Sequence, residues 1–159
     1  MQKIKVSLIG YGYWGAKLAR NFQNSNFFNL VSIIDISQKN LTKAKKDFPL
    51  VRADKNYKDI LKIKNISLVI ISTPTKTHAE IAKFAIKQDK HVLVEKPLAL
   101  TLNEVTKLEN LAKKNKKLLF VDYPFLFSGS INYIKKMIDS KKYGDLLEIE
   151  SYREQAPIR

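Results

Sequence analysis

The chain has 159 residues, of which 45% are hydrophobic and 28% are charged, a balance typical of a globular domain with a real hydrophobic core. No run approaches the roughly 18 apolar residues of a membrane span. The first residues lead directly into a strand-like segment, without an apolar region and a cleavage site, so we expect no secretory signal. Cysteine is absent, which excludes disulfides and thiol chemistry. We expect a cytoplasmic protein with no membrane partner and no metal site.

The formal net charge of +14 allows two interpretations. A basic surface is typical of nucleic-acid-binding proteins. However, only four of the 29 cationic residues are arginines, so 25 are lysines, and a dedicated nucleic-acid-binding protein would use arginine more often for bidentate phosphate contacts. Isoleucine and asparagine are also abundant, as an A+T-rich genome would produce. We therefore favour the compositional explanation and expect no nucleic-acid partner.

Apolar strand-like segments alternate with amphipathic helical ones along most of the chain. The expected strands are residues 4–9, 30–34, a weak one near 51, 68–71, 92–94 and 118–121. The expected helices are residues 13–24, 38–47 with Ser37 as cap, and 57–61, followed by two that start at the capping-box pairs Thr77/Glu80 and Thr101/Glu104. This alternation predicts an α/β fold with a doubly wound parallel sheet of the Rossmann type.

The pattern changes after Asp122, where a loop at 124–129, a helix at 131–138 and a strand at 146–152 are expected. We predict a dinucleotide-binding Rossmann domain over residues 1–122. Residues 123–159 are expected to form a separate, second unit.

The segment from Gly10 to Gly15 matches the pattern G-x-G-x-x-G between an expected strand and an expected helix. Gly10 permits a tight turn, Gly12 lets the backbone approach a pyrophosphate, and Gly15 lets the helix pack against the strand. The helix amino terminus offers N–H groups to phosphates. We expect Tyr13 and Trp14 to contact the cofactor through their backbone amides more than through their rings.

An acidic residue, Asp35, ends the second expected strand, 20 residues after Gly15. It can accept hydrogen bonds from the adenosine ribose and would repel a 2′-phosphate, so NAD is favoured over NADP. The adjacent Ile36 is also expected at the cofactor. Ser37 and Lys39 lie close enough in sequence to hold a phosphate, which keeps NADP as the less favoured alternative.

Two further strand ends carry polar residues, and ligands of open α/β sheets bind at such ends. The first comprises Ser72, Thr73, Pro74 and Thr75, with His78 following. The second is Glu95-Lys96-Pro97. Taken alone, a histidine at a helix start is more often a cap or surface residue, and a Glu-Lys pair is more often a solvated turn.

Together these motifs resemble the glucose–fructose oxidoreductase/inositol dehydrogenase family (Gfo/Idh/MocA), and particularly its NAD-dependent sugar and nucleotide-sugar dehydrogenases. The resemblance covers essentially the whole chain, and Glu95-Lys96-Pro97 is its most specific part. It implies that Lys96 is catalytic beside the nicotinamide, that Glu95 contacts the nicotinamide ribose, and that the segment from Ser72 to His78 borders the cofactor. It also implies a cis bond between Lys96 and Pro97. A histidine usual near position 123 is replaced by Asp122-Tyr123-Pro124.

The resemblance further implies that residues 123–159 are the incomplete start of a second, α+β domain that binds substrate. It also implies a small sugar or nucleotide-sugar substrate whose hydroxyl is oxidised. The family's catalytic Asp and His would follow the stretch resembling 152–159, and neither His78 nor His91 matches that histidine. We therefore expect NAD(H) binding with little turnover by this chain alone. An exposed strand edge near its end would favour a homo-oligomer. The alternative is a non-catalytic dinucleotide-binding or sensing module.

Overall fold

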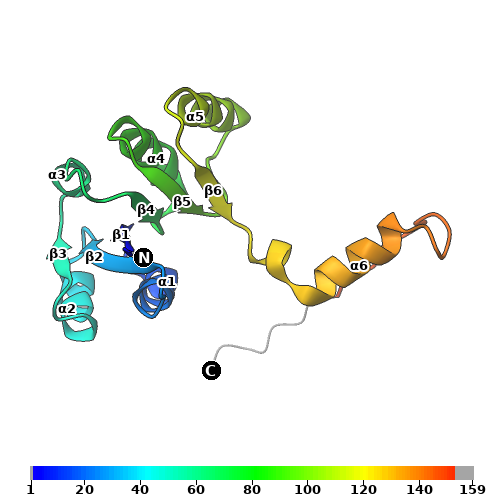
Figure 1. The fold of residues 1–159 in the computed structure, drawn as a ribbon, viewed down its shortest axis with the longest axis horizontal. Coiled ribbons are helices and arrows are strands. Elements are labelled where there is room, and N and C mark those ends of the chain that lie inside the picture. Colours follow the sequence, from blue (N-terminus) through cyan, green and yellow to red (C-terminus); the bar gives the residue numbers. More distant parts are fainter. Residues whose placement is uncertain (1, 153–159) are drawn as a thin grey trace. The chain divides into compact units, whose positions relative to one another are not determined.

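Six parallel strands form one sheet in the order β3-β2-β1-β4-β5-β6 in the computed structural model, which describes residues 2–152 (Figure 1). The strands are β1 (Ile4–Ile9), β2 (Phe28–Ile34), β3 (Arg52–Asp54), β4 (Leu68–Ile71), β5 (His91–Glu95) and β6 (Leu119–Asp122). The order shows that the chain winds outward from β1 to β3, returns to β4 beside β1, and winds outward again to β6. This is the doubly wound sheet that the sequence predicts.

Helices cover both faces of this sheet. They are α1 (Tyr13–Gln23), α2 (Gln38–Asp47), α3 (Tyr57–Leu61), α4 (His78–Lys87) and α5 (Leu102–Lys114). Figure 1 shows α1 and α2 on one face and α3, α4 and α5 on the other. Because parallel strands covered on both sides must be apolar on both sides, β4 sends Val69 and Ile71 into one core cluster and Ile70 into the other.

The helix starts confirm one expected capping box and correct the other. Thr101 and Glu104 form the full reciprocal pair at the start of α5. Thr77 makes no capping bond, because its hydroxyl donates back to the Pro74 carbonyl at 2.7 Å. Glu80 instead accepts a hydrogen bond from the Tyr57 phenol, which joins α4 to α3. Thr77 and Glu80 therefore form no capping box, and Glu80 makes a tertiary contact instead.

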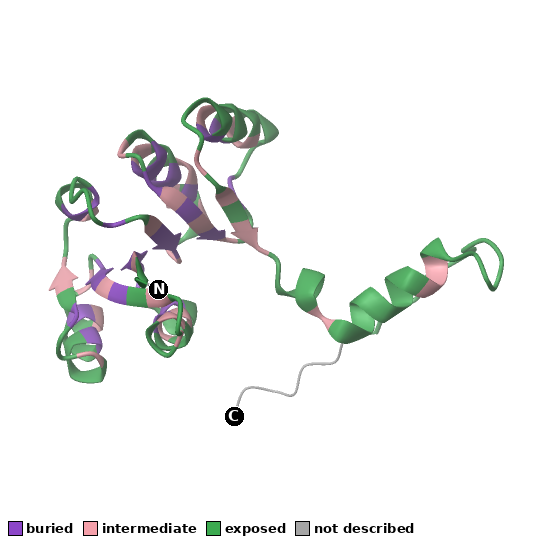
Figure 2. Ribbon diagram, viewed as in Figure 1, coloured by how far each residue is buried: buried purple, intermediate pink, exposed green. Residues whose placement is uncertain are grey.

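The chain divides into two units between Asp122 and Tyr123. In the second unit, a 3₁₀ turn (Pro124–Phe127) precedes α6 (Gly129–Asp139). No residue between 123 and 152 is buried, in contrast to the first unit (Figure 2). The expected strand at 146–152 is wrong: this segment is in no strand, because no described segment pairs with it and a strand requires ladder hydrogen bonds with a neighbour.

Within residues 2–152, no helix combines the length and the apolar character that crossing a membrane requires.

Candidate functional site

The parallel register brings the polar residues singled out from the sequence to one edge of the sheet. Ile34, Ile9, Ile71 and Val94 are neighbours across β2, β1, β4 and β5. The residues that follow them directly are Asp35, Gly10, Ser72 and Glu95. Ser72 donates from its backbone amide to Ile9, and Gly10 donates to Ile34, so the four strand ends are held side by side. This is the edge where open α/β sheets bind ligands.

Gly10 occupies the switch point of the sheet, between β1 and β4. Its φ of +94° is in the region that favours glycine. A Cβ on Gly10 would also collide with the carbonyl group of Ser72 at the end of β4. Both the backbone conformation and the close approach of the neighbouring strand therefore require glycine here.

The other two glycines of the loop differ in what surrounds them. A Cβ on Gly15 would collide with the Gly10 carbonyl, so this glycine lets α1 start tightly against the loop, as expected from the sequence. A Cβ on Gly12 would meet no protein atom within 4 Å. Gly12 thus borders an open cradle at the amino end of α1, where a pyrophosphate would need the space of that Cβ.

The start of α1 suits an anion. Gly12 is its N-cap and provides no side-chain oxygen, and its first turn contains no acidic residue. The free N–H groups of a helix start and the positive end of its dipole attract phosphate. The rings of Tyr13 and Trp14 are mostly exposed and meet edge to face at 5.5 Å between centroids, with the Lys17 ammonium over both.

Asp35 is buried and its carboxylate is already held by three donors. Oδ2 accepts from the Tyr11 backbone amide at 2.7 Å and from the Asn40 side chain at 3.0 Å, and Oδ1 accepts from the Ser37 amide at 2.8 Å. A carboxylate has about four lone-pair positions, so Asp35 retains capacity for a ligand hydroxyl in a fixed orientation. The adjacent Ile36 exposes 90% of its surface.

Sequence reasoning missed the roles of Tyr11 and Asn40. Nothing in the motif marks Tyr11, because its contribution is a backbone amide, whereas its buried phenol donates to Asp47 at 2.7 Å. The Asn40 amide reaches Asp35 from the first turn of α2. Its spacing of five residues from an acid that ends a strand, just after the Ser37 cap, is the signal that could have indicated it.

The turn after β4 is fixed by hydroxyl groups. The Thr77 hydroxyl gives its only hydrogen to Pro74, so the Thr73 hydroxyl, 2.7 Å away, must donate to Thr77. His78, which the sequence suggests as a cofactor neighbour, is only 1% exposed. Its two ring nitrogens lie 2.7 Å from the Thr73 carbonyl oxygen and 2.8 Å from that of Pro97. Both ring nitrogens of His78 are therefore occupied, which leaves none for a hydrogen bond to a cofactor.

Glu95 ends β5 and Lys96 follows it, and the Lys96–Pro97 bond is cis, as the resemblance implies. Lys96 is exposed at this edge, while Glu95 is half-buried. Burial raises the pKa of the Glu95 carboxyl, and the neighbouring Asp122 raises it further. Asp122 pairs with Glu95 across β5 and β6, so two acids end adjacent strands. Asp122 was not singled out as a site residue from the sequence.

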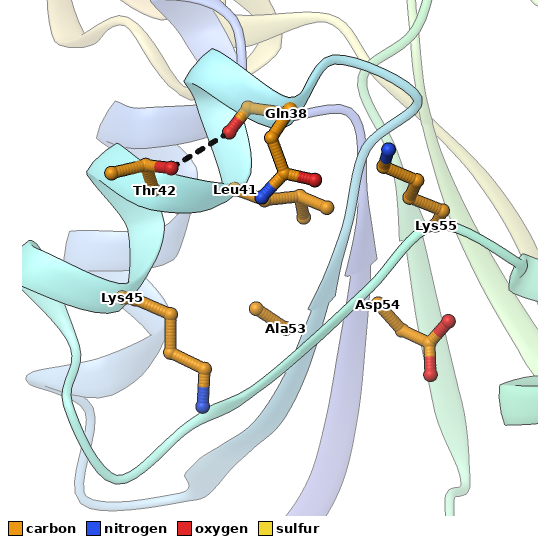
Figure 3. Close-up of a pocket in the computed structure, with 7 residues that line it drawn as sticks. All are labelled: Gln38, Leu41, Thr42, Lys45, Ala53, Asp54 and Lys55. Atoms are coloured by element: carbon orange, nitrogen blue, oxygen red, sulfur yellow. Dashed lines mark hydrogen bonds between the residues drawn. The ribbon is translucent and has the colours of Figure 1, made fainter.

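A separate depression of about 590 Å³ lies between α2 and β3 (Figure 3). The residues that line it are Gln38, Leu41, Thr42, Lys45, Ala53, Asp54 and Lys55. The hydrogen bond drawn there, from Thr42 to the Gln38 carbonyl, is internal to α2. None of the residues singled out from the sequence lines this depression, and we assign it no role.

The six-stranded fold, the glycine cradle at α1 and the acid at the end of β2 define a Rossmann-type dinucleotide-binding domain. Residues 4–123 match the model of the Gfo/Idh/MocA oxidoreductase family with its NAD-binding Rossmann fold, and the chain belongs to this family.

Three similar proteins place the chain in context. It is 30% identical over 148 residues to 1-carboxy-3-chloro-3,4-dihydroxycyclohexa-1,5-diene dehydrogenase of Comamonas testosteroni, covering 93% of this chain and 37% of that protein. It is 28% identical to myo-inositol 2-dehydrogenase of Thermotoga maritima, covering 97% and 46%. The crystal structure of Synechocystis biliverdin reductase with biliverdin and NADP⁺ matches with a TM-score of 0.77 and 33% identity, covering 84% and 42%. The chain thus spans less than half the length of each.

Proposed function

We propose that this chain is the cofactor-binding part of an NAD-dependent oxidoreductase that acts on a hydroxyl of a sugar or nucleotide sugar. The observation that carries the proposal is the shared edge of the sheet. There, the glycine cradle, the oriented Asp35 carboxylate and the exposed Lys96 follow strands that are in register. A dehydrogenase of a dihydroxylated ring and an inositol dehydrogenase among the relatives support the substrate class.

The cofactor would be held from both sides of the switch point. The α1 amino end and the loop from Gly10 to Gly15 would bind the pyrophosphate, and Asp35 with Ile36 would bind the adenosine ribose and border the adenine. The turn comprising Ser72, Thr73, Pro74 and Thr75 would border the opposite side. The preference for NAD follows from charge: the Asp35 carboxylate repels a 2′-phosphate, although Ser37 and exposed Lys39 lie beside it.

Lys96 is the proposed catalytic residue. When bound, the nicotinamide supplies the hydride acceptor or donor. The Lys96 side chain would orient the substrate hydroxyl by a hydrogen bond. In the oxidation direction its neutral amine would accept the hydroxyl proton as the hydride leaves the carbon, and in the reverse direction its ammonium would return that proton. Glu95, beside it, would accept hydrogen bonds from the nicotinamide ribose. The segment after Asp122 would begin the domain that covers the substrate, and we propose little turnover by these 159 residues alone.

Fluorescence titration with NADH and NADPH tests the cofactor assignment. Wild-type protein should bind NADH more tightly than NADPH, and Asp35→Ala should reduce the affinity for NADH by about tenfold or more, the effect of losing a hydrogen bond to a charged group. Asp54→Ala is the matched control, because Asp54 ends the adjacent strand β3 but is paired with Arg52. Equal affinities of the wild type for both cofactors would refute the NAD preference.

Self-association is a separate proposal. It was expected from a strand edge near 146–152, which the structure does not contain. The remaining support is the exposed apolar surface of the second unit, including Phe125, Leu126, Phe127 and Tyr133. Light scattering tests it, and a monomer across the micromolar range would refute it.

A further inference from the structure

The two turns at the centre of the proposed site are joined by a single buried side chain. His78 begins α4, immediately after the turn that contains Thr73. Its ring reaches from the Thr73 carbonyl to the Pro97 carbonyl, next in sequence to Lys96. The two turns follow adjacent strands, β4 and β5, and this bridge connects them beyond the last residues paired between these strands, Ile71 and Val94.

The two carbonyl contacts restrict how the His78 ring can form hydrogen bonds. A carbonyl oxygen only accepts hydrogen bonds, and a neutral imidazole donates only one. With carbonyl oxygens at 2.7 Å and 2.8 Å from its two nitrogens, a neutral ring would place one bare lone pair against a carbonyl oxygen in a buried position. Only the imidazolium form, which carries a hydrogen on each nitrogen, satisfies both contacts.

A buried cation requires compensation, especially at the amino end of α4, where the helix dipole disfavours positive charge. The two carbonyl dipoles provide part of it. Glu95 provides a nearby carboxyl group, and the charge of His78 offsets a small part of the rise in its pKa that burial and Asp122 cause. Lys96, on the same turn as Pro97, is exposed to solvent, so its charge is screened.

From this geometry we propose that His78 is a positioning residue for Lys96. As an imidazolium, it donates to Thr73 and Pro97 and so holds the turn containing Glu95 and Lys96 against the turn after β4. The inference rests on the proposed function, because it is Lys96 beside the nicotinamide that must be positioned. It assigns His78 no contact with substrate or cofactor.

Nitrogen-15 NMR of the ring nitrogens tests the protonation state without relying on any ligand. The chain has only two histidines, and His91 is an internal reference because its Nδ1 accepts from the Leu118 amide at 3.0 Å and must be bare. At pH 7 we expect His78 to have hydrogens on both nitrogens and His91 to lack one on Nδ1. A bare nitrogen on His78 would overturn the proposal.

Binding measurements test the positioning role. Calorimetry with NADH and with ADP, which lacks the nicotinamide half, is performed on His78→Gln and on the matched control His91→Gln. A glutamine amide cannot donate in two opposite directions, so His78→Gln should weaken NADH binding by about tenfold, the effect of one lost hydrogen bond to a charged group. ADP binding should change less than about twofold, and His91→Gln should alter neither.

The possible results separate the two proposals. Loss of NADH and ADP affinity to the same extent in His78→Gln, or no loss of either, would refute the positioning role while leaving the cofactor assignment intact. Wild-type protein that binds neither probe would refute the proposed function and the positioning role with it, whatever the NMR result. If His78→Gln does not fold, His78→Asn replaces it, and a doubly protonated His78 in the wild type remains a required result.

Discussion

The backbone amide of Tyr11 donates a 2.7 Å hydrogen bond to Oδ2 of Asp35, 24 residues away in sequence. This bond ties the glycine loop to the acid that follows the next strand, so the Asp35 carboxylate is already oriented in the absence of a ligand. The Tyr11 phenol also donates a hydrogen bond to Asp47, which connects the glycine loop to the end of α2. Binding groups oriented in advance lose less entropy when a ligand binds.

Substitutions at Gly10 and Gly12 should affect different properties: the first mainly the stability of the fold, the second mainly cofactor binding. Gly10→Ala forces a residue with a Cβ to adopt φ +94° against the Ser72 carbonyl, so we expect a loss of at least about 2 kcal/mol in the free energy of unfolding. Gly12→Ala meets no protein atom and should cost about 1 kcal/mol or less. It should nevertheless weaken NADH binding at least about tenfold. Urea unfolding and NADH fluorescence measure the two effects.

The control for this pair is Gly129→Ala, since Gly129 also has open space around it but begins α6, outside the first unit. It should change neither quantity appreciably. If Gly12→Ala binds NADH as tightly as the wild type, the open space at Gly12 is not part of the cofactor site.

The buried hydroxyls of Ser7 and Ser32 form a pair across β1 and β2, 2.7 Å apart. Either single substitution by alanine leaves one buried hydroxyl without its partner, so each should cost about 1–3 kcal/mol. The double substitution removes both groups and should cost clearly less than the sum of the two single substitutions. Chemical unfolding of the four proteins measures the coupling, and strictly additive costs would contradict the pairing.

Tyr57 should contribute to stability at alkaline pH. Burial, followed by its hydrogen bond to Glu80, raises the pKa of Tyr57 to about 12, from an ordinary value of 10.0. Between these two values the unfolded chain releases the phenolic proton and the folded chain retains it. The contribution is therefore complete below about pH 10 and is lost as the pH rises toward 12. We expect Tyr57→Phe to show a smaller fall in unfolding free energy over this interval than the wild type.

Tyr133→Phe is the control for the pH experiment, because Tyr133 is exposed on α6. It should reproduce the wild-type pH dependence. Identical pH profiles for Tyr57→Phe and wild type would contradict the assigned pKa shift.

Asp122 should influence the titration of Glu95. Burial and the adjacent Asp122 raise the pKa of the Glu95 carboxyl above 4.5. The folded state therefore retains this proton longer than the unfolded chain, and stability falls as the pH rises from about the unfolded value through the raised one. Asp122→Asn removes one cause, so it should lower the pKa of Glu95 and reduce this fall. Carbon-13 NMR of the Glu95 carboxyl follows the titration.

The comparison for this experiment is Asp139→Asn, since Asp139 pairs with Lys135 on α6 in the second unit. Its substitution should not move the Glu95 midpoint. A midpoint that also stays unchanged in Asp122→Asn would show that burial alone raises the pKa.

Most of the fold could be predicted from the sequence, because its signals are local. Alternating apolar and amphipathic segments reflect strands covered on both faces and helices covered on one, and the expected bounds of β1, β4 and α3 agree with the structure. The strand expected at 146–152 is wrong because apolar composition indicates only the tendency to pair, whereas pairing depends on a neighbour.

The sequence by itself determined the class of site: the spacing of Gly10, Gly12 and Gly15 and the position of Asp35 follow from the local backbone geometry of a strand, a turn and a helix. Only the tertiary structure decided how these parts are joined. The bond from Tyr11 to Asp35 and the bridge of His78 between two carbonyls connect segments that follow different strands, and such contacts leave no periodic trace in the sequence. They depend on the register of parallel strands, which hydrogen bonding and core packing fix only when the sheet assembles.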